Sequence, residues 1–393
     1  MKRAEFITLS ACVMILTALG IDIMLPAFGD VRRHFHLSPG STQTSLIIAA
    51  FFLGQVAQIA FGTVSDSWGR LIILRVGFPL YIAGGLAAAF APDLPTIYVA
   101  RFVQGIGASA LFMITIAGVR DRFAGDEMAR TMSLVFTIFL FTPIVAPFLG
   151  AALLAVSSWR IVFLVPPVFA GGVFLWSLRL EESLPRERRR PLDPAGIART
   201  VGDVLRNRTF LRYVGVTTAV FSVFSSYLAS SERIIGEIYG RPELFVWIFG
   251  FTGLVQSAST FLNARLVKRF GARRSLRALL VVYCVVACAL SLVTWWHGDP
   301  PGMLVFFAGM VVLVALVPTI EPNSSALALE PLGAMAGTSA AIYGTTFFFI
   351  GSLMGTFVSR LLVGSVAPLA FGHAIAGFIA LALAWSDRRP PTR

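Results

Sequence analysis

The stretch "GTVSDSWGRLIILR" (residues 62–75) is a polar turn placed between two long apolar segments of the chain. These segments cover approximately residues 43–63 and 74–91. A helix needs about 20 apolar residues to cross the hydrocarbon core of a bilayer, and both segments are close to that length. The stretch therefore predicts two membrane helices that are joined by a tight turn at one surface of the membrane.

The rest of the chain has the same alternation of long apolar segments and short polar turns. Of its 393 residues, 56% are hydrophobic and 13% are charged, whereas soluble proteins contain about 25% charged residues. Strands of a membrane barrel are short and alternate in polarity, so continuous segments of this length predict an all-α membrane protein. We count twelve of them, near residues 6–28, 43–63, 74–91, 97–118, 131–155, 160–178, 210–230, 243–264, 276–296, 302–320, 335–357 and 364–385.

The positive charge is concentrated in alternate loops. The net charge is +12, and dense runs of Arg and Lys occupy residues 179–212 and 265–277. Cytoplasmic loops of membrane proteins are enriched in these residues, which predicts that both termini lie in the cytoplasm. The basic loops then face anionic lipid, and we expect no nucleic-acid partner.

The longest polar stretch, residues 178–209, separates six apolar segments from six others. We expect an N-terminal six-helix bundle (1–178), a cytoplasmic linker (179–209) and a C-terminal six-helix bundle (210–393). Pro185, Pro191 and Pro194 prevent a long helix in the linker, which leaves room for one short amphipathic helix near residues 195–206. Gly69 and Gly271 occupy equivalent turns of the two halves, and such parallel repeats are typical of transporters with a substrate site at the midplane.

The motif "GTVSDSWGR" resembles the signature of the major facilitator superfamily, through Gly62, Asp66, Gly69 and Arg70. The resemblance implies two six-helix bundles. From the residues themselves, we expect Arg70 to pair with Asp121 in a latch that stabilises one conformation and opens in the other. Basic residues are common in the family where this chain has Ser67 and Leu71. An ordinary polar turn is the alternative interpretation.

The segment "RFVQGIGAS" (101–109) resembles the motif of the fourth helix in the same family. The resemblance implies that Arg101, together with Gln104 on the same helix face, lies at the central cavity and assists proton transfer. The alternative is that Arg101, near the start of its helix, extends its side chain to the membrane surface.

The segment "FTPIVAPFLGA" (141–151) resembles the antiporter motif of the fifth helix, through Pro147 and Gly150. Pro143, Pro147 and Gly150 share one face, which predicts a bend and close helix packing. Ala146 and Ala151 replace glycines of the motif. The resemblance favours export over import, and a bend without any role in coupling is the alternative.

Within the superfamily, "IDIMLPAF", "NARLVKRFGARR" and "PNSSALALEPLGAMAGTSAA" together resemble the Bcr/CflA-type drug-resistance branch. This resemblance implies a drug/proton antiporter of the bacterial inner membrane, which we expect to be a monomer. The segment "YLASSERIIGEIYG" departs from the branch. Glu232 and Arg233 in it are interpreted as an outer gate, an internal pair or a solvated helix end.

The stretch "LTALGIDIMLPAF" (16–28) holds one carboxylate, Asp22, in an apolar segment, with Pro26 one turn later. A charge at this depth is costly and usually marks a function. Burial favours the protonated form of a carboxylic acid, so we expect Asp22 to carry the coupled proton and, when ionised, to attract a cationic substrate. We expect no equivalent acid in the second half. The alternatives are a packing role through a hydrogen bond and a side chain that reaches the outer surface.

The substrate cavity is predicted from residue type alone. The chain has 34 Phe residues, which suits broad apolar recognition with few fixed polar groups. The candidate cavity residues are Gln55, Gln58, Phe112, Phe136, Phe139, Phe221, Phe224, Tyr227, Asn323 and Phe347.

These observations predict a secondary active transporter that exports small amphipathic or drug-like compounds in exchange for protons. The nucleotide-binding pattern G-x-x-x-x-G-K-[ST] is absent from the sequence, so the proton gradient is expected to supply the energy, without cofactor or metal. An enzyme is not expected, because no catalytic cluster of polar residues occurs in the sequence. The alternatives are an exporter of a sugar, amino acid or nucleoside, and a non-transporting receptor of the same fold.

Overall fold

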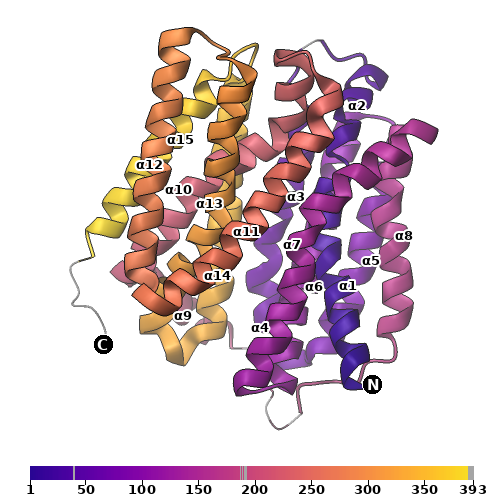
Figure 1. The fold of residues 1–393 in the computed structure, drawn as a ribbon. Helices are drawn as coiled ribbons and strands as arrows, with labels where there is room; N and C mark the ends of the chain where they lie inside the picture. The colour runs from indigo at the N-terminus through magenta and orange to yellow at the C-terminus, as the bar shows by residue number, and fades with distance from the viewer. Residues whose placement is uncertain (39, 186, 188, 190–192, 388–393) are drawn as a thin grey trace. The chain divides into compact units, whose positions relative to one another are not determined.

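The computed structural model of the chain is all-helical and describes residues 1–38, 40–185, 187, 189 and 193–387. Twelve helical segments are long and apolar enough to cross a membrane, which confirms the predicted fold class and the positions of the twelve spans. Contacts divide the chain into two compact units, residues 1–194 with 243–250 and residues 195–242 with 251–393. In Figure 1 the long helices of each unit run side by side in roughly one direction.

The helices of the first part of the chain are α1 (Arg3–Asp22), α2 (Phe28–His34), α3 (Ser45–Gly54), α4 (Gln58–Trp68), α5 (Arg70–Ala89), α6 (Leu94–Arg122), α7 (Gly125–Val156) and α8 (Trp159–Ser177). Short 3-10 turns join α1 to α2 and α3 to α4, and each pair forms one span. The continuous first helix expected over residues 6–28 is therefore wrong in detail, because the α-helix stops at Asp22.

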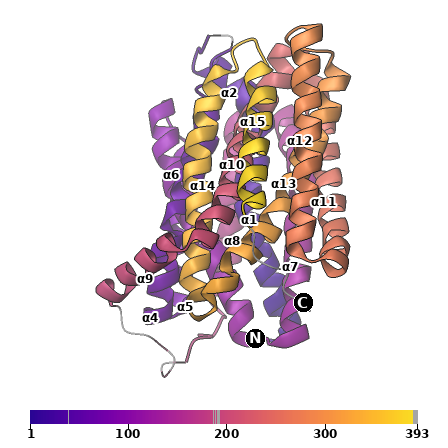
Figure 2. The ribbon, with the colours of Figure 1, turned by 90° about the vertical axis from the view of Figure 1, so that its left-hand side faces the viewer.

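The helices of the second part are α9 (Pro194–Arg206), α10 (Arg208–Arg233), α11 (Phe245–Phe270), α12 (Ala272–His297), α13 (Met303–Leu329), α14 (Ala336–Leu361) and α15 (Ala367–Trp385). Helix α9 is the short linker helix that the sequence predicts, and Figure 2 shows it crossing the direction of α14 and α15. Pro191, which the sequence analysis also assigns to the linker, lies outside the described residues. Helix α10 belongs to the most enclosed span of this part, in which 89% of an apolar 18-residue stretch is buried.

Glycines allow the helices of the first unit to approach at backbone distance. A Cβ atom on Gly105 of α6 would overlap the carbonyl oxygen of Phe51 in α3, and one on Gly54 would overlap the carbonyl oxygen of Phe102. Small residues are common at such contacts in membranes, where packing replaces the hydrophobic effect as the force between helices. The α3–α6 contact brings the side chain of Arg101 close to α3.

We predict that Gly105→Ala destabilises the protein by about 1–3 kcal/mol, the usual cost of overpacking a tight contact. The control is Gly172→Ala in α8, where an added Cβ meets no atom within 4 Å. The melting temperatures of both variants, measured in detergent, test the prediction. Equal melting temperatures for Gly105→Ala and the wild type would contradict the packing described here.

Candidate functional site

The first membrane span is interrupted at Asp22. Pro26 has no N–H group, so the carbonyl of Asp22 cannot receive its usual helical hydrogen bond, and α1 ends at this residue. The carboxylate of Asp22 is buried, with 5% of the residue exposed. Within the part of the chain that the structure describes, it has no hydrogen bond and no ion pair. It is therefore a buried carboxylate without a partner among the described residues. It neither packs through a hydrogen bond nor reaches the outer surface, which were the two alternatives in the sequence analysis.

Arg101 is enclosed by acceptors from three helices. It is fully buried, and its guanidinium donates to Gln104 Oε1 at 2.5 Å, to the carbonyl of Gly20 at 2.7 Å and to the carbonyl of Ile47 at 3.5 Å. Its charged group also lies 4.4 Å from the centre of the Phe51 ring. The side chain does not extend to the membrane surface, so that alternative is wrong.

The contact between Arg101 and Gly20 follows from the interruption of the helix. In a continuous α1 the carbonyl of Gly20 would accept from the N–H of Met24, but that N–H instead contacts the carbonyl of Ile21 at 3.4 Å. Arg101 satisfies the carbonyl that is left free. Arg101 and Gln104 are thus joined to the backbone two residues before Asp22, and not to its carboxylate.

Helix α7 contacts the same interruption through Gly150. A Cβ atom at Gly150 would overlap the carbonyl oxygen of Ile23 and lie 3.2 Å from the ring of Pro26. Helix α7 continues as one helix through Pro143 and Pro147. The glycine of the antiporter-like motif therefore packs directly after Asp22 in the first unit.

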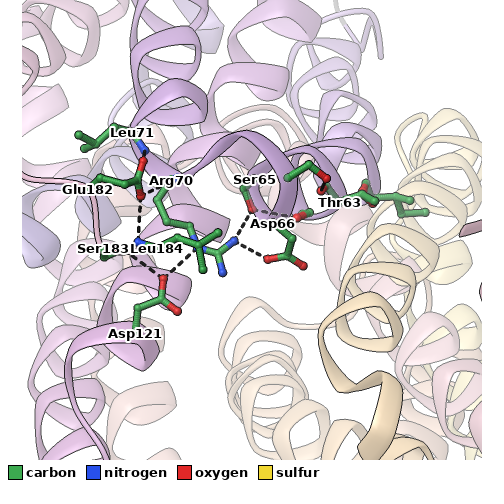
Figure 3. Close-up of polar contacts among 12 residues, drawn as sticks. Thr63, Ser65, Asp66, Arg70, Leu71, Asp121, Glu182, Ser183 and Leu184 are labelled. Carbon is green, nitrogen blue, oxygen red and sulfur yellow. Dashed lines mark hydrogen bonds and ion pairs between the residues drawn. The ribbon is translucent and has the colours of Figure 1, made fainter. Parts of the chain in front are cut away.

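Figure 3 shows the polar cluster around Arg70, at the end of α4 and the start of α5. Arg70 donates to Asp121 Oδ2 at 2.9 Å, to Asp66 Oδ1 at 2.5 Å and to Ser65 Oγ at 2.7 Å. The Ser65 hydroxyl in turn donates to the carbonyl of Gly62 at 2.8 Å.

Gly69 between the helices has a φ of +107°, a conformation that side-chain-bearing residues rarely adopt.

Glu182, which the sequence analysis does not predict, completes this cluster from the linker (Figure 3). Its carboxylate accepts from the N–H groups of Arg70 at 2.9 Å and Leu71 at 3.2 Å, which have no partner inside α5. Burial raises the pKa of Glu182, but backbone hydrogen bonds and the charge of Arg189 outweigh it, and the net pKa is lowered. No spacing rule connects residues this far apart in sequence, so only the polar "EES" (181–183), a few residues after α8, could have suggested it.

The candidate cavity residues fall into separate groups and do not form one described site. Gln58 donates to Gln55 at 3.1 Å, and Asn323 donates to Asn263 at 2.9 Å. The rings of Phe136 and Phe139 are 6.5 Å apart in α7. Three of the remaining candidates have rings in contact between α10 and α14, namely Phe221, Phe224 and Phe347. Tyr227 is buried, and Phe112 is half-buried.

Two polar groups of the second unit are buried: Asp387, which is missing from the sequence prediction, and Arg233, whose role the sequence analysis leaves open. Asp387 is 3% exposed and accepts from the Tyr213 hydroxyl at 2.7 Å, with Arg273 at 3.4 Å. Arg233 is 2% exposed and donates to the carbonyl of Ser359, so the interpretation as a solvated helix end is wrong for this residue.

Glu321 is a further residue that the sequence analysis missed, and it corrects the end of a predicted segment. The sequence predicted a tenth segment near residues 302–320 and no acid in the second half equivalent to Asp22. Helix α13 instead continues to Leu329, which places Glu321 inside the span Met303–Gly333.

The fold and the buried polar groups define a multi-pass membrane protein built as a secondary transporter. The family model of the Major Facilitator Superfamily matches residues 10–356. The chain therefore belongs to this superfamily, which makes it a secondary transporter of a small-molecule substrate and not an enzyme.

Similar proteins support this assignment and the predicted resemblance. The chain is 30% identical to the Uncharacterized MFS-type transporter YdgK of Bacillus subtilis, over 91% of this chain and 89% of that protein. It is 27% identical to the Bicyclomycin resistance protein homolog of Haemophilus influenzae, over 93% and 92%. It is 24% identical to Multidrug resistance protein D of Escherichia coli, over 88% and 86%. The crystal structure of a D-xylose-proton symporter has the same fold, with a TM-score of 0.75 at 16% identity over 98% of this chain and 97% of that one.

We predict that Arg70→Lys destabilises the first unit by about 1.5–3 kcal/mol, the range for hydrogen bonds to charged groups. An ammonium group cannot reproduce the planar fork with which Arg70 contacts Asp121 and Asp66 together. The melting temperature in detergent is the measurement. The control is Arg33→Lys, at an exposed pair with Asp30. A melting temperature equal to that of the wild type would show that the cluster adds no stability.

We predict that the stabilisation from Glu182 depends on pH. Because the folded state lowers its pKa below the ordinary 4.5, this stabilisation is present above that value and is lost as the pH falls through the folded-state pKa. The difference in melting temperature between the wild type and Glu182→Gln should therefore be largest near neutral pH and shrink below about 4.5. A difference that stays constant or grows in acid would contradict the capping role.

Proposed function

We propose that this chain exports small amphipathic, drug-like compounds from the bacterial cytoplasm in exchange for protons, by alternating access, with Asp22 as the proton carrier. The observation that carries the proposal is the buried carboxylate of Asp22, which has no partner among the described residues. A carboxylate in a permanent ion pair would keep its charge through the cycle. Asp22 is free to bind a proton where water reaches it and to release the proton when its surroundings change.

Arg101 and Gln104 are proposed as positioning residues for the carrier. The charge of Arg101 is satisfied by Gln104 and by two backbone carbonyls. It therefore does not neutralise Asp22, and it holds α1 at Gly20. Gly150 of α7 packs against the carbonyl of Ile23 on the other side of the carrier. A shift of either contact would change the surroundings of the carboxylate, which is what coupling requires.

The remaining parts of the proposal draw on the relatives and on the charge pattern. Two relatives at 24–27% identity are named for bicyclomycin resistance and multidrug resistance, which favours drug-like substrates. The basic runs at 179–212 and 265–277 favour an inner membrane orientation with both termini in the cytoplasm. The Arg70 cluster would act as a latch that stabilises one conformation, and the transporter would work as a monomer.

The first test measures proton movement in everted membrane vesicles with an acidic interior. Lipophilic cations, neutral antibiotics and sugars are added in turn, and a fluorescent dye reports the pH gradient. We predict that at least one amphipathic compound dissipates the gradient in wild-type vesicles, and that Asp22→Asn, which cannot carry a proton, abolishes this response.

The matched control is Asp30→Asn, the same chemical change in the same span at a half-buried residue that pairs with Arg33. This variant should keep the wild-type response at equal expression. If Asp22→Asn still exchanged protons with an unchanged pH dependence, the carrier assignment would be wrong. A response to sugars alone would favour a metabolite exporter, and no response in correctly folded protein would favour a receptor.

A further inference from the structure

A second carboxylate lies deep in the membrane, in the other unit of the chain. Glu321 is near the middle of the span Met303–Gly333. It is on the side of α13 that packs on α10, because Ser324, one turn later, donates to the carbonyl of Tyr213 at 3.1 Å. No hydrogen bond or ion pair reaches its carboxylate from the residues that the structure describes. An ionised group of this kind is costly in a membrane unless a ligand compensates it.

The helix segment before Glu321 has backbone carbonyls that lack their usual donor. Pro318 and Pro322 both lie inside α13. Because proline has no N–H group, the carbonyl oxygens of Val314 and Pro318 receive no hydrogen bond in the α-helical pattern. The Pro318 carbonyl, one turn before Glu321, is therefore an oxygen atom without its helical donor.

A group of aromatic rings from α10 and α14 lies in the same unit as Glu321. Glu321 and Tyr343 face neighbouring turns of α10, because Ser324, one turn after Glu321, donates to the Tyr213 carbonyl. The Tyr343 hydroxyl is 2.5 Å from Thr217 Oγ1, one turn after Tyr213. The Tyr343 ring lies 5.7 Å from the Phe347 ring, which is 5.1 Å from Phe221. Phe348 lies 4.3 Å from Phe347. We define Phe221, Tyr343, Phe347 and Phe348 as the aromatic cluster.

Glu321 is less deeply buried than these neighbours. Thr217, Phe221, Tyr343 and Phe347 are buried, whereas Glu321 is only half-buried. Part of the residue is therefore not covered by the protein. Aromatic faces attract cations, most strongly when water is excluded, so the carboxylate and the rings favour the same kind of ligand.

We propose that Glu321 and the aromatic cluster form a binding site for lipophilic organic cations, with Glu321 as the anionic anchor and the rings as the apolar contact. The inference rests on the proposed function, because it names a substrate class for the same transporter. Asp22 then carries the proton in one unit, and Glu321 binds the positive group of the substrate in the other. Neutral substrates would contact the rings without using Glu321.

The test compares two ligands with the same aryl groups, tritiated tetraphenylphosphonium and neutral tritiated triphenylphosphine oxide. Binding to the purified full-length protein in lipid nanodiscs is measured by scintillation proximity at one mildly alkaline pH. Glu321→Gln should weaken tetraphenylphosphonium binding at least tenfold and change binding of the neutral ligand less than twofold. Glu321→Asp, which keeps the charge, should restore most of the cation affinity.

The matched control is Glu330→Gln, the same change at an exposed position after the end of α13. It should bind both ligands like the wild type, and melting temperatures verify that each variant is folded. The proposal is overturned if wild-type protein does not bind tetraphenylphosphonium. It is also overturned if Glu321→Gln binds it within twofold of wild type, or loses both ligands equally.

The two proposals can fail separately. If cation affinity does not depend on Glu321 while antiport in vesicles requires Asp22, the cation site is wrong and the proposed function stands. If Glu321→Gln loses only the cation while Asp22→Asn keeps proton exchange, the cation site stands and the carrier assignment falls.

Discussion

A proline that cannot donate a hydrogen bond determines the structure around Asp22. In a membrane no water is present to satisfy a free backbone carbonyl, so an interrupted helix must find partners within the protein. Pro26 ends α1 at Asp22, the buried Arg101 supplies a donor to Gly20, and the backbone at Ile23 packs on Gly150. The carboxylate is left without a partner while the backbone around it is fixed.

The same constraint operates in the second unit. Glu321 lies between Pro318 and Pro322 in α13, and it too has no partner among the described side chains. Each unit thus combines a membrane carboxylate with prolines that free nearby carbonyl groups. The surroundings differ, because an arginine binds the backbone two residues before Asp22, whereas Glu321 faces the part of α10 that packs on the ring of Tyr343. This difference is the physical basis for assigning the proton to one carboxylate and an organic cation to the other.

The sequence predicts the parts of this structure that depend on composition and local spacing. Twelve spans, the linker helix and the superfamily follow from apolar length and from the motif at residues 62–70. Contacts between distant segments could not be predicted, because no spacing rule relates Glu182 to the start of α5, or Arg101 to a carbonyl in α1. Glu321 was missed because two prolines and a charge make the end of an apolar segment look like a loop, although the helix continues through them.

The central claim is that the carboxyl group of Asp22 gains and loses a proton as the transporter works. Infrared difference spectroscopy of the protein in lipid measures this directly, through the C=O stretching band of a protonated carboxylic acid. The account predicts a band that is present without substrate, that weakens when a transported compound binds, and that is missing in Asp22→Asn. A band that persists in Asp22→Asn, or that does not respond to the compound in the wild type, would contradict it.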